Sequence, residues 1–312
     1  MREVLFVAGE ASGDMHAGSV AAHLREIRPD LTTAGVGGPH MRSSGVVITR
    51  DYAELAVMGF AEVLKHIPKH AKLLSELRAR IASGDVAAVV LIDYPGFNMK
   101  VAAAAQAAGV PVLYYVTPQV WAWGAGRLPK LAKLVTKAAV ILPFEQPLLE
   151  GYGIDATFVG HPLLDRAGNL SSRDEARARL GISEAERVLA LFPGSRGQEI
   201  ARHFAPFIES GRELARRYPG LRVIVHAAPT VDLTELDCPF EIVHGASFDV
   251  LRAADVALCK SGTTTLEAAI AQCPMAVAYR TGALSYAIAR RVVKIPYIGL
   301  VNVVAGREVA RE

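Results

Sequence analysis

Leu189-Ala190-Leu191-Phe192-Pro193-Gly194-Ser195-Arg196 is an apolar strand that breaks into small residues and then opens a helix. Further along the chain, Cys259-Lys260-Ser261-Gly262-Thr263-Thr264-Thr265-Leu266-Glu267 has the same pattern. A strand-to-helix turn of this kind presents backbone N–H groups at the positive end of the helix dipole, where a phosphate can bind. The two stretches therefore predict an α/β fold whose helices begin at anion-binding turns.

Side chains in both turns suit a diphosphate-linked nucleotide. Arg196 offers a planar fork for bidentate phosphate contact, and Glu267 is placed to accept hydrogen bonds from ribose hydroxyls. The alternative is a pair of ordinary capped helices, because Ser and Thr are preferred N-cap residues. We favour the ligand because both side chains are correctly placed. The remaining contacts with this ligand are expected from Gly194, Ser195, Ser261, Gly262 and Thr263.

Strands and helices alternate along the chain, and the strands are continuous apolar runs, which indicates that both faces of each sheet are buried. This order predicts a doubly wound α/β fold. Strands are expected at 3–8, 31–36, 46–49, 86–92, 111–116, 138–142, 156–159, 187–192, 221–226, 240–243, 255–258 and 274–278. Helices are expected at 12–27, 60–81, 97–108, 125–136, 171–180, 198–217, 247–253, 263–271 and 283–291.

A polar, charged stretch at 167–179 interrupts the alternation and indicates a domain boundary within 162–186. We therefore expect two Rossmann-like domains, 1–165 and 166–312, that face a cleft. In such sheets ligands bind beyond the carboxyl ends of the strands.

Bulk composition excludes several classes of protein. The net charge of +3 over 312 residues argues against a nucleic-acid-binding protein. Three cysteines without a CxxC pair fit a reduced compartment, and the N-terminus is a short strand with no signal peptide. The longest uncharged run, 101–126, contains Gly109, Pro111 and Pro118 and is not a membrane span. We expect a cytoplasmic protein, or one attached to a membrane at its surface.

The first strand is followed by a glycine-rich turn, 9–18, that opens the first expected helix. Its acidic residues would repel a pyrophosphate, so we expect this turn to contact sugar hydroxyls or an acceptor. The acceptor-side candidates are Glu10, Ser12, Gly13 and Asp14. The alternative for Asp14 is a helix cap.

Asp93 is the strongest catalytic candidate. It ends the strand 86–92, and a carboxylate at the carboxyl end of a strand, facing a cleft, is well placed to act as a general base. The alternative is that Asp93 caps the helix that follows.

Two basic stretches lie beside apolar or aromatic residues, as they do in peripheral proteins that bind anionic lipid. The first, 62–80, follows the apolar run 55–60, and the second, 127–137, follows a pair of tryptophans. The alternative is two solvated helix faces. We expect membrane contacts from Val57, Met58, Phe60, Lys65, Lys69, Lys72, Arg127 and Lys130.

Motifs spread along the chain jointly resemble one family. They are 9–14, 92–98, 118–123, 159–162, 193–196 and 261–267, with the ending Asn302-Val303-Val304-Ala305-Gly306-Arg307-Glu308. On these motifs the sequence resembles the lipid-A-disaccharide synthases. The resemblance implies a GT-B glycosyltransferase that inverts the anomeric centre and needs neither a metal nor another cofactor.

The same resemblance implies the substrates UDP-2,3-diacylglucosamine and 2,3-diacylglucosamine 1-phosphate, which give a β-1,6-linked disaccharide 1-phosphate and UDP. It implies peripheral attachment to the cytoplasmic face of a Gram-negative inner membrane. Asp93 is then the base and Arg196 stabilises the leaving diphosphate, with Asn302 and Arg307 as further donor contacts.

Members of this family continue past the Asn302 motif with further helices, so we expect this chain to lack C-terminal helices and to be less active without them. The apolar segment 298–305 should dock beside the turn at Ser261. Two alternatives remain open. One is a UDP-N-acetylglucosamine 2-epimerase, which has the same architecture, and the other is an inactive UDP-binding remnant.

Overall fold

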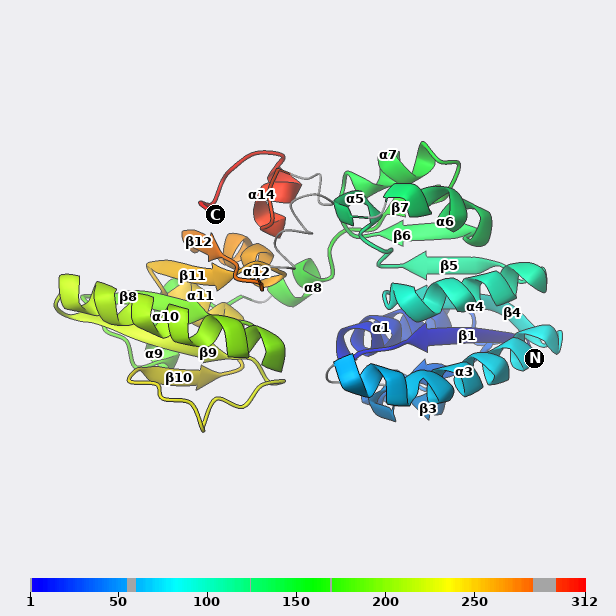
Figure 1. Ribbon diagram of the computed structural model, residues 1–312, viewed down its shortest axis with the longest axis horizontal. Helices are drawn as coiled ribbons and strands as arrows, with labels where there is room; N and C mark the ends of the chain where they lie inside the picture. The colour runs from blue at the N-terminus through cyan, green and yellow to red at the C-terminus, as the bar shows by residue number, and fades with distance from the viewer. Residues whose placement is uncertain (1, 55–59, 124, 169, 283–295) are drawn as a thin grey trace. The chain divides into compact units, whose positions relative to one another are not determined.

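The computed structural model describes residues 2–54, 60–123, 125–168, 170–282 and 296–312 (Figure 1). They form two compact units, Met1–Gly160 and His161–Glu312. The observed boundary follows Gly160, whereas the sequence predicts a boundary after residue 165. The expected helix at 283–291 lies outside the described residues.

The N-terminal unit contains a seven-stranded sheet in the order β3-β2-β1-β4-β5-β6-β7, with every neighbouring pair parallel. The strands are β1 (Glu3–Ala8), β2 (Thr32–Gly37), β3 (Val47–Asp51), β4 (Val86–Ile92), β5 (Val112–Tyr115), β6 (Lys137–Val140) and β7 (Asp155–Phe158). The helices are α1 (Ala11–Ile27), α2 (Pro39–Ser43), α3 (Phe60–Ala82), α4 (Pro95–Ala107), α5 (Val120–Trp123), α6 (Leu128–Leu134) and α7 (Glu145–Glu150). Two short 3₁₀ segments, η1 (Tyr52–Glu54) and η2 (Ala125–Arg127), complete the set.

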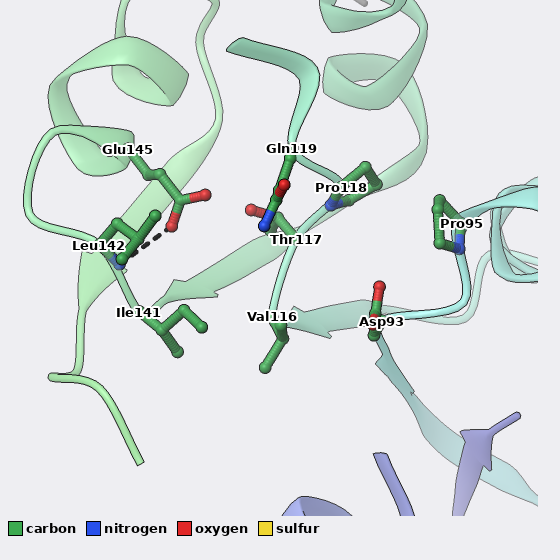
Figure 2. Close-up of a pocket in the computed structure, with 9 residues that line it drawn as sticks. All are labelled: Asp93, Pro95, Val116, Thr117, Pro118, Gln119, Ile141, Leu142 and Glu145. Carbon is green, nitrogen blue, oxygen red and sulfur yellow. Dashed lines mark hydrogen bonds between the residues drawn. The ribbon is translucent and has the colours of Figure 1, made fainter. Parts of the chain in front are cut away.

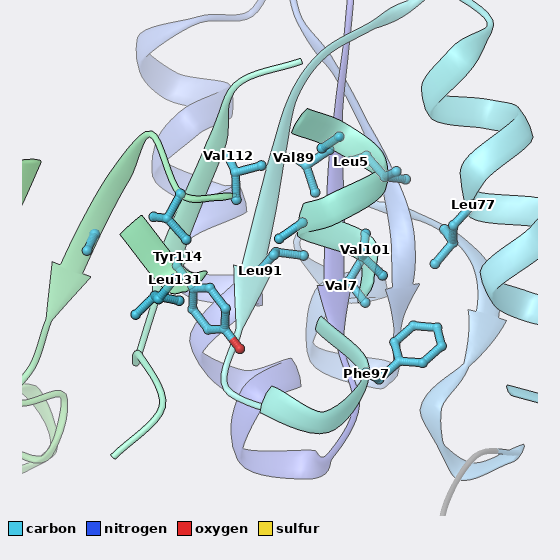
Figure 3. Packing of buried hydrophobic residues seen from close by; sticks show 14 of the residues in the cluster. Leu5, Val7, Leu77, Val89, Leu91, Phe97, Val101, Val112, Tyr114 and Leu131 are labelled. Atoms are coloured by element: carbon cyan, nitrogen blue, oxygen red, sulfur yellow. The ribbon is translucent and has the colours of Figure 1, made fainter. Parts of the chain in front are cut away.

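Both faces of the central strands of this sheet are buried, as their apolar sequences predict. Along β4, Val89 and Leu91 pack on the side of α3, α4 and α6, whereas Val90 and Ile92 pack on the side of α1 and α2. Figure 3 shows the first of these two layers, where Phe97 and Val101 of α4 lie against β1 and β4.

The C-terminal unit contains a five-stranded parallel sheet in the order β10-β9-β8-β11-β12. The strands are β8 (Arg187–Phe192), β9 (Leu221–Ala227), β10 (Glu241–His244), β11 (Val256–Lys260) and β12 (Met275–Ala278). The helices are α8 (Leu163–Ala167), α9 (Arg173–Arg179), α10 (Gly197–Arg217), α11 (Ser247–Ala253), α12 (Thr264–Ile270) and α14 (Leu300–Ala305).

The charged stretch that suggested a boundary is an integral helix of the C-terminal unit. Ser172 and Glu175 form a capping box at the start of α9. Arg177 is buried, and its guanidinium donates to the carbonyl oxygens of Ala253, Ser183 and Glu186. The other charged residues of α9 are exposed, so this helix packs on the unit through Ala176 and Arg177, whose guanidinium satisfies carbonyl groups there.

Strand order reverses once in each sheet. In the N-terminal unit the reversal lies between β1 and β4, and in the C-terminal unit it lies between β8 and β11. Ligands of doubly wound sheets bind beyond the carboxyl ends of the strands at such reversal points. Asp93 directly follows β4, while the turns 193–196 and 261–263 directly follow β8 and β11.

The C-terminal segment docks on the second of these turns, as predicted. The hydroxyl of Ser261 donates a 2.6 Å hydrogen bond to the carbonyl oxygen of Ile298, and the N–H of Val301 donates to Oγ1 of Thr265. In the described part of the chain, every helix is too short or too polar to span a bilayer.

Candidate active site

A cavity of about 290 Å³ lies at the carboxyl ends of β8, β9 and β11 in the C-terminal unit. It brings together four of the residues that the sequence assigns to a nucleotide: Gly194, Ser195, Thr263 and Glu267. Its other lining residues are Phe192, His226, Ala228, Pro229, Gly245, Ala246, Ser247 and Thr264. Side chains from the two predicted turns thus share one cavity.

The first turn differs in one respect from the sequence-based expectation. The N–H of Ser195 donates a 2.9 Å hydrogen bond to Oε2 of Glu199, so it is not available to a phosphate in this structure. Arg196 occupies the N-cap position of α10, is 70% exposed, and lies 3.6 Å from Oε1 of Glu199. Its guanidinium is the group of this turn best placed to reach an anion in the solvent.

His226 lines the same cavity, although no sequence pattern indicates it. Its ring stacks on Phe192 with centroids 4.6 Å apart. Burial lowers the pKa of His226 to about 4, so the ring is neutral at neutral pH. A lone histidine inside an apolar strand gives no sequence signal of a cavity, because only the packing of β9 beside β8 brings it there.

The sequence also predicts that Asn302 and Arg307, in the C-terminal tail 298–312, contact the UDP-sugar donor. For Asn302 the structure corrects this prediction. Asn302 is fully buried, and its Nδ2 donates to the carbonyl oxygen of Ala310 and to Oε1 of Glu312. Its Oδ1 accepts from the N–H groups of Val309 and Ala310. Both donors and both lone pairs of this amide are therefore used within the tail. Arg307 is exposed.

A second cavity, of about 240 Å³, lies in the N-terminal unit and includes Asp93 in its lining (Figure 2). Polar groups come from Asp93, Thr117, Gln119 and Glu145, and the apolar part comes from Pro95, Val116, Pro118, Ile141 and Leu142. A mixture of apolar wall and a few polar groups is typical of a small-ligand site.

Backbone strain gathers at this cavity. Asp93, Tyr94 and Val116 have φ values of 45°, 49° and 55°, in the left-handed region that non-glycine residues avoid. For Val116 this conformation is especially costly because its side chain is β-branched. Strained residues of this kind persist where surrounding contacts hold them, and they are common at active sites.

Buried side chains hold the strained turn in place. The main-chain carbonyl oxygen of Asp93 accepts hydrogen bonds from Nδ2 of Asn98 and from the hydroxyl of Tyr114, each at 2.8 Å. The ring of Tyr94 lies where a Cβ at Gly9 would be, which explains a glycine at that position. Tyr94, the residue after Asp93, occupies the N-cap position of α4.

A buried carboxylate, Glu145, orders the other side of this cavity and was not predicted. Its Oε1 accepts from the indole N–H of Trp121, and its Oε2 accepts from the N–H of Leu142. Burial raises the pKa of Glu145, while these hydrogen bonds oppose the rise. Trp121 also packs edge-on against Phe144, with centroids 5.1 Å apart.

The glycine-rich turn after β1 contains one residue whose carboxylate has another role. Asp14 is fully buried, and its carboxylate accepts from the N–H groups of Gly38, His40 and Met41 at the start of α2. It therefore caps α2, and the expectation that its carboxylate contacts an acceptor is corrected. Ser12 donates to Glu10, and neither these two residues nor Gly13 lines the cavity of Figure 2.

The basic residues that were expected at a membrane lie on α3, η2 and α6. Lys69, Lys72, Arg127 and Lys130 are exposed. Both α3 and α6 pack against α4, so the helices that carry these residues cover one face of the N-terminal sheet (Figure 1). Val57 and Met58 lie outside the described residues, and the side chains of Phe60 and Lys65 are not described.

Solved structures of an epimerase and of a glycotransferase share this architecture. A UDP-GlcNAc 2-epimerase from Neisseria meningitidis, bound to UDP-GlcNAc, has a TM-score of 0.62 at 16% identity over 97% of this chain and 90% of its own. The glycotransferase of kitacinnamycin has a TM-score of 0.56 at 18% identity over 90% of this chain and 81% of its own. The fold is thus the GT-B architecture that glycosyltransferases and these epimerases share.

Sequence comparison identifies the family. Residues 4–312 match the lipid-A-disaccharide synthetase family model, and the chain belongs to this family of glycosyltransferases. A lipid-A-disaccharide synthase from Geobacter metallireducens is 42% identical over all of this chain and 83% of its own length. One from Anaeromyxobacter dehalogenans is 40% identical over 99% of this chain and 83% of its own. The epimerase alternative shares the fold, but the family match is with the glycosyltransferases.

Proposed function

We propose that this chain transfers the diacylglucosaminyl group of UDP-2,3-diacylglucosamine to the 6-hydroxyl of 2,3-diacylglucosamine 1-phosphate, with inversion. The products are the β-1,6-linked disaccharide 1-phosphate and UDP. One observation carries the proposal: each sheet has a cavity at the carboxyl ends of its strands, one lined by residues of both turns and Glu267, the other by Asp93.

In this reaction the C-terminal unit binds the donor. The diphosphate lies at the starts of α10 and α12, where Arg196 and the helix dipoles supply positive charge. Glu267, which is 9% exposed in the cavity wall, accepts hydrogen bonds from the ribose hydroxyls. Gly194, Ser195 and Thr263 line the cavity at the phosphate site, and Ser261 and Gly262, which do not line it, complete the second turn. Exposed Arg307 remains a further candidate for contact with the UDP-sugar.

The N-terminal unit supplies the base. The carboxylate of Asp93 takes the proton of the acceptor hydroxyl, whose oxygen attacks the anomeric carbon through an oxocarbenium-like state. The bond from that carbon to the diphosphate breaks, and its electron pair leaves with UDP. Charge that develops on the diphosphate is stabilised by Arg196 more strongly in the transition state than in the ground state, so this mechanism requires no metal ion.

The acylated substrates enter from a bilayer in this proposal. Exposed Lys69, Lys72, Arg127 and Lys130 attract anionic lipid at the cytoplasmic face of the inner membrane. The polar turn residues Glu10, Ser12 and Gly13 remain candidates for the acceptor side, whereas Asp14 and Asn302 have the structural roles described above.

A direct assay tests this function. The purified chain, in detergent micelles with EDTA, is incubated with both acylated substrates, and the disaccharide and UDP are quantified by mass spectrometry. We expect disaccharide and UDP in equal amounts, with Asp93→Asn as the inactive control. Interconversion of UDP-N-acetylglucosamine in place of disaccharide synthesis would establish the epimerase alternative, and UDP binding without any turnover would indicate an inactive remnant.

A further inference from the structure

A partly buried ion pair joins the two turns of the C-terminal cavity. Nζ of Lys260, the last residue of β11, lies 2.7 Å from Oε1 of Glu199 in the first turn of α10. Each side chain is only 15% exposed. Because β11 lies beside β8, the pair connects the turn after one strand to the turn after its neighbour.

The glycines of both turns fit around this pair. Gly194 has a φ of +139°, and a Cβ there would lie 2.6 Å from Cβ of Glu199. Gly262 has a φ of +152°, and a Cβ there would lie 3.2 Å from Nζ of Lys260. A side chain at either position would be strained. At 194 it would force Glu199 to move, and at 262 it would crowd Lys260, so the two turns pack closely around the ion pair.

Glu199 also contacts the groups that a diphosphate would use. Its Oε2 accepts from the N–H of Ser195, and its Oε1 lies 3.6 Å from the guanidinium of Arg196. Burial favours the neutral form of Glu199, but Lys260, the Ser195 N–H and Arg196 outweigh it and hold its pKa below the usual value. An ionised carboxylate thus lies beside the phosphate site, and Lys260 is its closest counter-charge.

We propose that Lys260 is a positioning residue for the donor diphosphate. By neutralising Glu199, it prevents that carboxylate from drawing Arg196 inward and from repelling the phosphates. This inference rests on the proposed UDP-sugar site. The two members of the ion pair should therefore differ in their effect on UDP binding. Loss of Lys260 leaves the negative charge of Glu199 to compete with the phosphates, whereas loss of the charge on Glu199 leaves no such competitor.

A double-mutant cycle on UDP binding tests the proposal, with dissociation constants measured by titration calorimetry. Lys260→Met should weaken UDP binding roughly 30-fold, the scale for removing one partner of a hydrogen-bonded charge pair. Lys260→Arg should retain most of the affinity. Adding Glu199→Gln to Lys260→Met should recover about tenfold, because the uncompensated charge is then removed. Glu209→Gln, at an exposed glutamate on the same helix, is the matched control.

Three outcomes would overturn the inference. Equal losses of UDP affinity in Glu199→Gln and Lys260→Met, with parallel losses of thermal stability, would show that the ion pair has a purely structural role. No recovery in the double variant would show that Lys260 acts on the phosphates directly. Unchanged affinity in Lys260→Met would show no role at all. If the unaltered chain does not bind UDP, the proposed function fails together with this inference, whereas the other outcomes leave that function standing.

Discussion

The phenol of Tyr114 donates a 2.8 Å hydrogen bond to the main-chain carbonyl oxygen of Asp93. Tyr114 is fully buried on β5, and its pKa is raised by burial and by the nearby charge of Asp93. With Asn98, it fixes the left-handed turn that presents Asp93 to its cavity. The core of the N-terminal unit thus determines the position of the proposed base.

The first prediction concerns this hydrogen bond. Tyr114→Phe removes one of the two donors to the Asp93 carbonyl, so kcat should fall several-fold, and the free energy of unfolding should fall by about 1 kcal/mol. Steady-state kinetics and denaturant unfolding measure the two effects. The control is Tyr152→Phe, at an exposed position. An unchanged kcat beside reduced stability would mean that the bond serves only the fold.

The second prediction concerns the base itself. Asp93→Asn should lower kcat by roughly 10²–10⁴, because a positioned general base contributes that much, while UDP affinity should stay the same. Kinetics and calorimetry on one preparation separate these quantities. Asp30→Asn, an exposed carboxylate paired with Arg28, is the control. Turnover within a few-fold of the unaltered chain would remove Asp93 from the mechanism.

The third prediction contrasts Arg196 and Glu267, the two residues assigned to the diphosphate and the ribose of the UDP-sugar. Arg196→Ala should cost about 3 kcal/mol of transition-state stabilisation, seen in kcat/KM, with little change in Tm because the side chain is 70% exposed. Glu267→Gln should mainly weaken UDP binding through the ribose. Arg216→Ala, 74% exposed on the same helix as Arg196, is the control. Equal UDP affinity before and after Glu267→Gln would contradict the ribose assignment.

The fourth prediction concerns the membrane. Binding to vesicles should rise with anionic lipid, fall with salt, and weaken in Lys69→Glu/Lys72→Glu, because each basic residue near the surface contributes about 1 kcal/mol. Co-sedimentation with vesicles measures this binding. Arg28→Glu/Arg42→Glu makes the same charge change near α1 and α2, on the other face of the sheet. Equal effects of the two double variants would show that no particular face binds lipid.

The fifth prediction concerns pH. The pKa of His226 is lowered from 6.5 to about 4 by burial, so between these values the unfolded chain binds a proton that the folded chain does not. The free energy of unfolding should therefore decrease as the pH falls from 6.5 to 4, by up to about 3 kcal/mol from this residue. Denaturant unfolding measures this free energy at each pH, and it should depend less steeply on pH in His226→Phe than in the control His23→Phe, where the histidine is exposed. Parallel curves would contradict the shift.

Sequence patterns located the strands well because each is a short apolar run between turn residues. The expected strands 86–92 and 187–192 match β4 and β8 residue for residue. The short helices α2 and α7 were missed, since five or six residues are too few to show a helical period. The expected helix at 125–136 is observed as η2 and the shorter α6, with Pro129 in the first turn.

The sequence by itself determined the order of strands and helices, the turns that open α10 and α12, and the place of Asp93 after β4, because these depend on neighbouring residues. Only the tertiary structure decided which polar groups remain for a ligand. Asp14 binds residues 24 to 27 positions away, and Lys260 pairs with Glu199 across 61 positions. A buried polar group must find a partner wherever the fold supplies one, and that partner is set by packing and not by the local sequence.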